Sequence, residues 1–334
     1  EDATFNTPNG RARLVPVVPQ LPQQALSDAA PLRLNTGRIR DQWHTMTRTG
    51  LSARLNIHMP EPFVEIHPET ARKYGIEERY ITTIKTRWGE MLARASISPD
   101  IEPDEIFIPM HWTNQLSSKS RVGALVNPVT DPESGQPESK HTPAIVYPWL
   151  PPWQGFLFSA EELPLLDCKY CVKAKGAEHF RYEIGHQQHN VNWADWLQRQ
   201  ITRELSRLEL IEYTDESNHV VRLAWLQNGK IQYCLYLADK PVSADNQWLS
   251  SLFAKSAIDE LDRLALLSGR PPSGMEDTGK IICACFSVGE KTIATAIETS
   301  NLTNVTAIGE HLKAGTNCGS CIPELRGLLE TCSV

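Results

Sequence analysis

Cysteine is missing from the first 167 residues of this 334-residue chain, and no apolar run approaches the ~18 residues that a membrane-spanning helix needs. Basic residues are not in excess, because 33 Lys and Arg stand against 40 Asp and Glu, a net charge of −7. A protein that binds the phosphate backbone of a nucleic acid needs a basic surface instead. We also find no phosphate-binding P-loop and no nucleophile triad. The sequence therefore excludes a membrane-spanning chain and argues against a nucleic-acid-binding one.

The composition is that of a globular protein, with 41% hydrophobic and 22% charged residues. The length predicts two or three domains of ~100–200 residues each. The chain begins with Glu1 and has no apolar leader segment, so we expect a cut within a longer chain. Five of the eight cysteines follow residue 282, and such a tight cluster points to a metal site in a reducing compartment. We therefore expect a cytoplasmic protein.

Four regions differ in their sequence pattern. Residues 1–30 are rich in Pro, Gln and Ala, which predicts an extended arm. Residues 31–150 contain many short strand patterns and almost no long helix, which predicts an all-β barrel. Residues 160–270 mix helical and hairpin patterns, as expected for a small α+β spacer domain. Residues 279–332 form a separate cysteine-bearing domain.

Local signals predict the boundaries of several elements. Asn228-Gly229 between two apolar runs is a strong hairpin signal, and Gly89 marks a second hairpin turn. Gly75 would end a short helix, and Tyr147–Trp153, rich in Pro and Trp, predicts a stiff linker. The predicted helices are Pro68–Tyr74, a helix from Trp193 towards Leu208, Trp248–Leu267, a helix through Ile293–Ile297 with Ser287 as its N-cap, and Pro323–Leu329.

The strongest chemical signal is two close pairs of cysteines. Cys283-Ala-Cys285 is followed, after 32 residues, by Cys318-Gly-Ser-Cys321. Two thiol pairs on separate loops can converge on one metal centre, and four thiolates suit soft metals. Zinc and a [2Fe–2S] cluster both fit this donor set, whereas buried or disulfide-bonded cysteines are the alternative reading.

Residues 281–329 resemble the bacterioferritin-associated-ferredoxin-like [2Fe–2S] domain. The resemblance covers Cys283-Ala-Cys285-Phe-Ser-Val, the helix Lys291–Ile297, Ala314-Gly315 and Thr316-Asn-Cys-Gly-Ser-Cys321. It implies that Cys283, Cys285, Cys318 and Cys321 ligate a [2Fe–2S] cluster. The resemblance, rather than the number of thiols, favours iron over zinc.

A second candidate site lies near the start of the β region. A strand runs into Thr36-Gly37-Arg38, and a polar segment with Arg40 and His44 follows. Glycine allows close approach of the backbone to a ligand, and arginine makes paired contacts to phosphates or to a purine edge. Such a turn, taken alone, is also typical of ordinary protein surfaces.

Several motifs in order resemble the C-terminal part of molybdopterin-dependent oxidoreductases, whose dinucleotide-binding domain folds as a double-psi β-barrel. The motifs are Phe5–Arg13, Thr36–Thr45, Glu65–Glu69, Ile108–Trp112 and Val126–Asp131 with Lys140. The resemblance implies that one loop holds the guanine-dinucleotide part of a bis-(molybdopterin guanine dinucleotide) cofactor. The residues it assigns are Thr36, Gly37, Arg38, Trp43, His44 and Thr45, with Asn127 and Lys140 as later contacts. His111 and Trp112 lie near the pterin in this reading, or are packing residues.

The combination of this β domain, a spacer and a C-terminal [2Fe–2S] domain resembles the bacterial assimilatory nitrate reductases. The resemblance implies reduction of nitrate to nitrite, with electrons from a reductase subunit, flavodoxin or ferredoxin. The [4Fe–4S] domain and the molybdenum-ligating core would belong to the rest of the catalytic subunit, so this chain alone should not reduce nitrate and contributes no catalytic side chain. The alternatives are another molybdopterin oxidoreductase, such as a formate dehydrogenase, and a non-catalytic iron–sulfur or zinc module.

The remaining cysteines carry weaker signals. Cys168-Lys-Tyr-Cys171 has metal-site spacing, and His179 and His186 follow it, but no second pair lies nearby. We interpret these two as ordinary thiols, with a separate metal site as the alternative. Cys234 is expected to be buried in a strand, and Cys332 to be a thiol at a frayed chain end.

Overall fold

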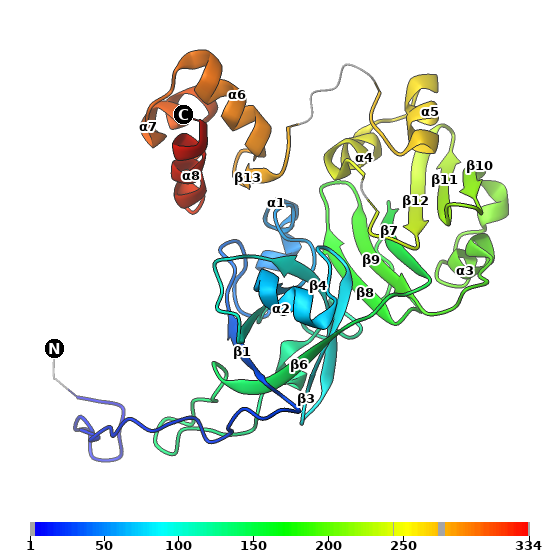
Figure 1. Cartoon of the computed structure of the whole chain (residues 1–334). Helices are drawn as coiled ribbons and strands as arrows, with labels where there is room; N and C mark the ends of the chain where they lie inside the picture. Colours follow the sequence, from blue (N-terminus) through cyan, green and yellow to red (C-terminus); the bar gives the residue numbers. More distant parts are fainter. Residues whose placement is uncertain (1–3, 243, 273–277, 333–334) are drawn as a thin grey trace.

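The computed structural model describes residues 4–242, 244–272 and 278–332. It consists of an extended arm, a β-barrel, a six-stranded sheet with helices, and a small helical domain that carries the clustered cysteines (Figure 1). The small domain lies above the barrel in this view, and the arm extends away at the lower left. The expected multidomain organisation is therefore observed.

The barrel is closed and six-stranded, in the order β1-β5-β2-β4-β3-β6, with β6 pairing back to β1. Two of its pairings, β1 with β5 and β2 with β4, are parallel, and the others are antiparallel. The all-β barrel predicted from the strand patterns is confirmed. The strands are β1 (Leu32–Gly37), β2 (Phe63–Ile66), β3 (Ile81–Thr86), β4 (Glu90–Ile97), β5 (Glu105–Pro109) and β6 (Thr142–Pro148).

Side chains of alternate residues along the strands fill the barrel interior. In β1 every second residue is buried, and Leu32 and Leu34 join the barrel core with branched residues of β2 and β5. The short helix α2 (Pro68–Tyr74) ends at Gly75, whose φ of 64° is left-handed, as the sequence predicted. The hairpin at Gly89 between β3 and β4 is also confirmed. Other short helical segments in this region are η1 (Thr49–Leu51), α1 (Ala53–Asn56) and η2 (Val122–Ala124).

The second unit is an antiparallel sheet in the order β10-β11-β12-β7-β9-β8. Its strands are β7 (Trp153–Ser159), β8 (Tyr170–Lys175), β9 (Phe180–His186), β10 (Glu209–Asp215), β11 (Val220–Gln227) and β12 (Lys230–Ala238). The hairpin predicted at Asn228-Gly229 joins β11 to β12. Because β7 already begins at Trp153, the predicted linker Tyr147–Trp153 is shorter than expected and joins the last strand of the barrel directly to this sheet.

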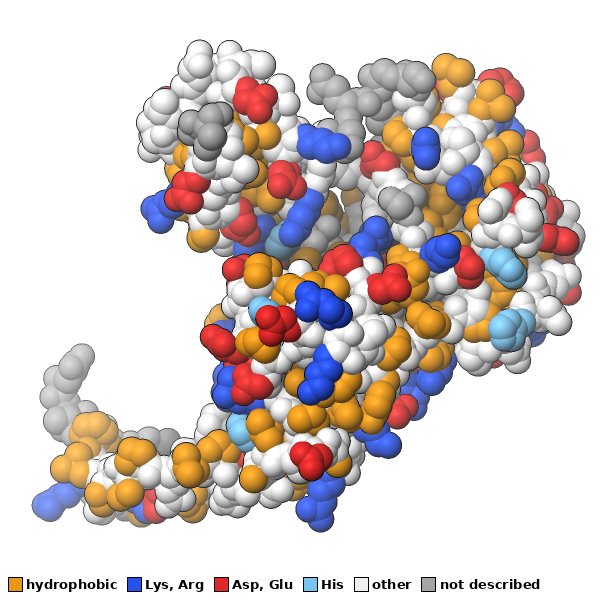
Figure 2. All heavy atoms as spheres, in the orientation of Figure 1, with side chains coloured by type: hydrophobic (Ala, Val, Ile, Leu, Met, Phe, Trp, Pro, Cys, Tyr) orange, Lys and Arg blue, Asp and Glu red, His pale blue; other side chains and the backbone are white. Residues whose placement is uncertain are grey.

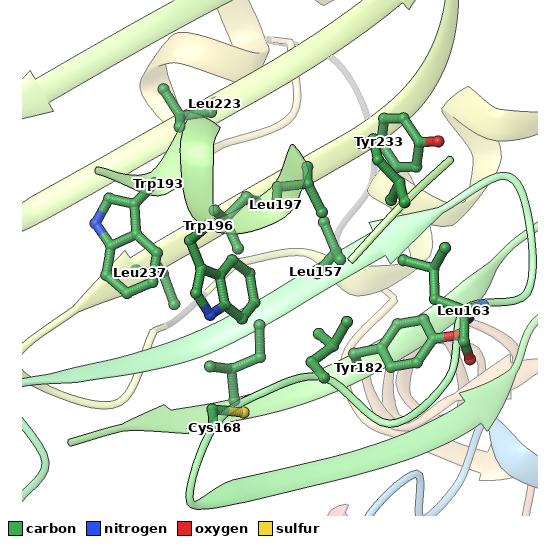
Figure 3. Packing of buried hydrophobic residues seen from close by; sticks show 14 of the residues in the cluster. Leu157, Leu163, Cys168, Tyr182, Trp193, Trp196, Leu197, Leu223, Tyr233 and Leu237 are labelled. Atoms are coloured by element: carbon green, nitrogen blue, oxygen red, sulfur yellow. Dashed lines mark hydrogen bonds between the residues drawn. The ribbon is translucent and has the colours of Figure 1, made fainter. Parts of the chain in front are cut away.

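Each face of this sheet has its own core, because consecutive side chains of a strand point to opposite faces. Leu157 of β7 packs with α3 (Trp193–Gln198) on one face, as Figure 3 shows for Trp193, Trp196 and Leu197. Phe156 of the same strand packs on the other face. That face is covered by α4 (Asn246–Ala254) and α5 (Glu260–Ser268).

Two of the helix predictions were wrong in extent. The single helix predicted at Trp248–Leu267 is two helices, because Asp259 begins α5 with a reciprocal capping box to Asp262. The helix predicted from Trp193 stops at Gln198, and a 3-10 turn, η3 (Leu205–Arg207), follows. The apolar spacing continues past 198 because Ile201 and Leu205 pack into the same core without continuing α3.

The third unit comprises β13 (Ile281–Cys283), β14 (Val288–Gly289), α6 (Glu290–Ser300), α7 (Val305–Leu312) and α8 (Ile322–Cys332). The helices predicted around Ile293–Ile297 and Pro323–Leu329 are therefore present. The predicted N-cap was wrong: Gly289 occupies the N-cap position, and Ser287 lies in a turn with φ of 54°. The core of this unit is small and centres on Ile293, Ile308 and Leu325.

The surface shows acidic and basic side chains intermixed on the face drawn in Figure 2, without a continuous basic tract there. The arm at its lower left is apolar, and Leu14, Val17 and Leu21 are each more than 80% exposed. No helix among the described residues has the length and apolar character that crossing a membrane requires.

Candidate cofactor sites

The first candidate site is built on the loop that follows β1. Gly37 ends that strand, and a Cβ atom there would lie 2.5 Å from the Phe107 ring, so only glycine fits without moving the ring. The Thr36 hydroxyl donates to the Ser139 carbonyl at 2.8 Å. The Lys140 amine donates to the Thr36 carbonyl, which brings the two separated parts of the predicted site together.

His111 fixes the conformation of this loop. Its Nε2 accepts a hydrogen bond from the Ile39 amide at 2.9 Å, and its Nδ1 donates to the His44 carbonyl at 2.6 Å. His111 is fully buried, and burial lowers its pKa, which favours the neutral ring that both bonds require. The loop backbone is left-handed at His44 and Met46, with φ of 44° and 58°. The imidazole thus holds a turn whose positive φ angles are uncommon for residues other than glycine.

The outer side of the loop presents the side chains that the sequence assigned to the cofactor. Arg38, Trp43, His44 and Thr45 are all exposed. The Arg38 guanidinium lies 4.4 Å from the centroid of the Trp43 ring, and Trp43 is 59% exposed. A cation, a hydroxyl and an open aromatic face are suited to phosphate and purine groups, so this donor set fits a dinucleotide.

Asn127 occupies a different position from the other assigned residues. Its side chain is buried, its amide nitrogen donates to the carbonyls of Glu138 and His141, and its oxygen accepts from the Val129 amide. These bonds hold the segment that carries Lys140. A direct contact of Asn127 with the cofactor stays a prediction.

The second candidate site is formed by the four clustered cysteines, which the fold brings into two pairs. The sulfur atoms of Cys285 and Cys318 lie 3.4 Å apart, and the Cys321 thiol is hydrogen-bonded to Cys283. Cys283 ends β13, and Cys321 directly precedes α8. Gly319, with φ of 74°, makes the tight turn between Cys318 and Cys321.

The two thiol pairs differ in environment. Cys283 and Cys321 are 2% exposed, whereas Cys318 is exposed to solvent. Burial, together with the neighbouring Cys283, raises the pKa of Cys321 to about 11. Hydrogen bonds from Ser320 lower the pKa of Cys318. One pair therefore faces the protein and the other faces the solvent.

This arrangement fits a binuclear cluster. A [2Fe–2S] cluster takes four thiolates, two on each iron, and two thiol pairs on facing loops supply that donor set.

The other cysteines lie away from this site. Cys168 and Cys171 are buried in the core that α3 covers, where the neighbouring Cys171 thiol and burial raise the pKa of Cys168 (Figure 3). Cys234 is buried in β12, as expected. Cys332 is the last residue of α8 and packs against the core of the cysteine-bearing domain.

Two important residues escaped sequence reasoning. His111 was assigned either to the pterin side or to packing, but it positions the loop that follows β1. Arg40 was noted only as part of a polar segment, yet it reaches the cysteine-bearing domain. Neither contact has a local sequence signal, because the partners of His111 and Arg40 lie 67 to 284 residues away along the chain.

Comparison with known proteins agrees with this geometry. Residues 32–143 match the family described as the molydopterin dinucleotide binding domain, and residues 281–331 match the BFD-like [2Fe-2S] binding domain. A nitrate reductase of Klebsiella oxytoca is 40% identical over 323 residues, 96% of this chain and 36% of that protein.

Two further relatives match a smaller part. The assimilatory nitrate reductase catalytic subunit of Bacillus subtilis is 33% identical over 37% of this chain and 18% of its own length. The F420-dependent formate dehydrogenase 1 subunit alpha of Methanococcus maripaludis is 34% identical over 40% of this chain and 19% of its own length. The chain thus spans about a third or less of the length of these relatives.

The closed barrel matches a dinucleotide-binding family, and the thiol-pair domain matches a [2Fe–2S] family. Together they define a part of a molybdopterin oxidoreductase. Within that class, the chain is similar over 96% of its length to a part of a nitrate reductase.

Proposed function

We propose that this chain serves a molybdenum-dependent assimilatory nitrate reductase in two ways. It holds the guanine-dinucleotide end of a bis-(molybdopterin guanine dinucleotide) cofactor, and it accepts electrons through its [2Fe–2S] cluster. The observation that carries this proposal is the identity of 40% to a nitrate reductase across 96% of the chain. That match includes the six-stranded sheet as well as the two cofactor domains, so it extends over all three units rather than one shared domain.

The dinucleotide end would be held by the loop that His111 positions. In this proposal the barrel is a double-psi barrel, Arg38 and Lys140 face the phosphates, and the Trp43 ring packs on a base or on the Arg38–ligand pair. Arg38 lies over the Trp43 ring, so the cation and the aromatic ring form one surface for such a ligand.

The proposed reaction converts nitrate, two electrons and two protons into nitrite and water. The molybdenum cofactor supplies the oxygen-atom chemistry when it is bound, and the residues that face its metal would belong to the rest of the catalytic subunit. This chain's own task is to orient the dinucleotide and to hold the thiolates. A reduced reductase subunit, flavodoxin or ferredoxin in the cytoplasm would supply the electrons one at a time. The solvent-facing pair Cys285 and Cys318 is the side from which such a donor can approach.

A second candidate is a formate dehydrogenase of the same class. It is favoured by the 34% identity of the formate dehydrogenase relative, which covers 40% of this chain. The two candidates share the dinucleotide domain and differ in substrate. Assays of the complete enzyme with nitrate and with formate distinguish them directly.

The test of electron acceptance uses the complete enzyme that contains this chain. Removal of residues from Gly279 onward should abolish nitrate reduction driven by the protein donor and spare reduction driven by small dye donors. Cys318→Ser should behave in the same way, with Cys332→Ser as the matched control that keeps both activities. Loss of dye-driven activity in the truncated enzyme, or full donor-driven activity in Cys318→Ser, would contradict the proposed role of the cluster.

A further inference from the structure

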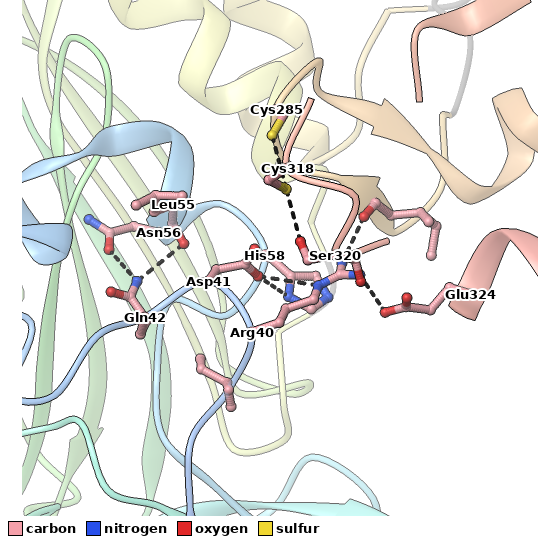
Figure 4. A network of polar contacts seen from close by, with 12 residues as sticks. Arg40, Asp41, Gln42, Leu55, Asn56, His58, Cys285, Cys318, Ser320 and Glu324 are labelled. Carbon is pink, nitrogen blue, oxygen red and sulfur yellow. Dashed lines mark hydrogen bonds and ion pairs between the residues drawn. The ribbon is translucent and has the colours of Figure 1, made fainter. Parts of the chain in front are cut away.

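Arg40 connects the dinucleotide loop to the cysteine-bearing domain. It lies two residues after Arg38 and three before Trp43, and its side chain is 17% exposed. One guanidinium nitrogen donates to the Glu324 carboxylate at 2.5 Å and to the Ser320 carbonyl at 3.3 Å. The other terminal nitrogen donates to the Ile282 carbonyl at 2.7 Å. Figure 4 shows the side chain reaching across to Ser320 and Glu324.

The two backbone acceptors hold special positions in the cysteine-bearing domain. Ile282 directly precedes Cys283, and Ser320 directly precedes Cys321. A single guanidinium therefore hydrogen-bonds to both segments that carry the buried thiol pair. Arginine suits this task because its planar fork directs several donors at once, whereas lysine offers only a point charge.

Charged groups of both signs surround this contact. Asp41 is buried, with a carboxylate oxygen 3.5 Å from Arg40 Nε and 2.7 Å from His58 Nδ1. The Arg40 guanidinium thus contacts the carboxylates of both Asp41 and Glu324 as well as the backbone beside the buried thiol pair.

We propose that Arg40 is a positioning residue that docks the [2Fe–2S] domain onto the dinucleotide-binding loop and raises the reduction potential of the cluster. The cluster and the dinucleotide end of the cofactor then share one loop of the barrel. This inference rests on the proposed function in one respect, because it requires the four cysteines to hold a [2Fe–2S] cluster.

The sign of the effect follows from charge. One electron from the donor reduces one iron of the cluster, and the cluster becomes more negative by one charge. A nearby guanidinium stabilises that added charge, and a nearby carboxylate destabilises it. Removing Arg40 leaves Asp41 and Glu324 without their cation, so the cluster should become harder to reduce. Removing the charge of Glu324 should make it easier to reduce.

The experiment is a redox titration of the purified chain, followed by the electron paramagnetic resonance signal of the reduced cluster. Arg40→Gln should lower the ratio of reduced to oxidised cluster by about tenfold at a fixed solution potential, a shift of about 59 mV for a one-electron couple. Glu324→Gln should shift the potential in the opposite direction while the carbonyl contacts of Arg40 remain. Arg40→Lys should retain most of the potential, because it keeps the charge. The exposed Arg72 on α2 provides the control variant Arg72→Gln, which should leave the potential unchanged.

The outcomes separate the two proposals. Shifts of opposite sign in Arg40→Gln and Glu324→Gln support the inference, since a purely structural contact would not reverse sign with charge. A loaded cluster whose potential is unchanged in both variants, or shifts in the same direction in both, would overturn the inference and leave the proposed function intact. A chain that takes up no iron and no sulfide would overturn the proposed function and, with it, this inference.

Discussion

Arg94 and Glu61 form an ion pair of 2.8 Å where the barrel meets the six-stranded sheet, and both side chains are largely buried. The pair joins the two units because each partner also contacts the sheet. Arg94 donates to Gln154 of β7 at 2.9 Å, and the Tyr170 hydroxyl of β8 donates to Glu61 at 2.6 Å. Burial disfavours the charge on both groups, but the carboxylates of Glu61 and Glu183 still raise the pKa of Arg94. The Arg94 guanidinium therefore keeps its charge in this contact.

Replacing Arg94 alone should be costly for this reason. Arg94→Met leaves the buried Glu61 carboxylate without its ion-pair partner, and we expect it to lower the free energy of unfolding by about 3–5 kcal/mol. The double variant Arg94→Met/Glu61→Gln should recover part of that loss. Denaturant unfolding of the chain measures both values, and a single variant as stable as the wild type would contradict this account of the contact.

His111 offers a test of the dinucleotide loop. His111→Phe leaves the Ile39 amide and the His44 carbonyl without their partner, and we expect a loss of about 1–3 kcal/mol in the free energy of unfolding. His111→Gln keeps a donor and an acceptor and should lose less. Equal losses for the two variants would show that the ring acts through packing alone.

His179 should make the stability depend on pH. It packs against the rings of both Phe158 and Phe253, and burial lowers its pKa to about 4. In the unfolded chain the ring takes up its proton near pH 6.5, so the unfolded state binds more protons between pH 6.5 and 4. Stability is therefore full above pH 6.5 and falls by up to about 3 kcal/mol as the pH drops towards 4.

The variant His179→Phe isolates this contribution. It removes the titrating group from the aromatic cluster, so its stability relative to the wild type should increase from pH 7 to pH 4.5. Chemical unfolding at the two pH values measures the difference. A difference that does not change with pH would rule out His179 as the source.

Much of the fold follows from local sequence signals. Asn228-Gly229, Gly75 and the strand alternation of β1 each have a local cause, and the structure contains the elements they predict. The helix break at Asp259 was missed because apolar spacing continues through it, although the aspartate with Asp262 three residues later is itself a capping signal.

The candidate sites were likewise predictable where the sequence signal is local, and not where a residue acts through a tertiary contact. The two thiol pairs are short motifs that the sequence displays, and the loop carrying Arg38 was found by resemblance. The roles of His111 and Arg40 were not accessible, because each depends on a contact between segments that only the folded chain brings together.

The most direct test of the account is the metal content of the anaerobically purified chain, measured as iron, acid-labile sulfide and zinc together with the visible spectrum. We expect about two irons and two sulfides per chain with the absorption of a [2Fe–2S] cluster, retained in Cys332→Ser and lost in Cys321→Ser. About one zinc per chain without sulfide would contradict the account, since the last domain would then be structural and electrons would have to reach the molybdenum cofactor by another route.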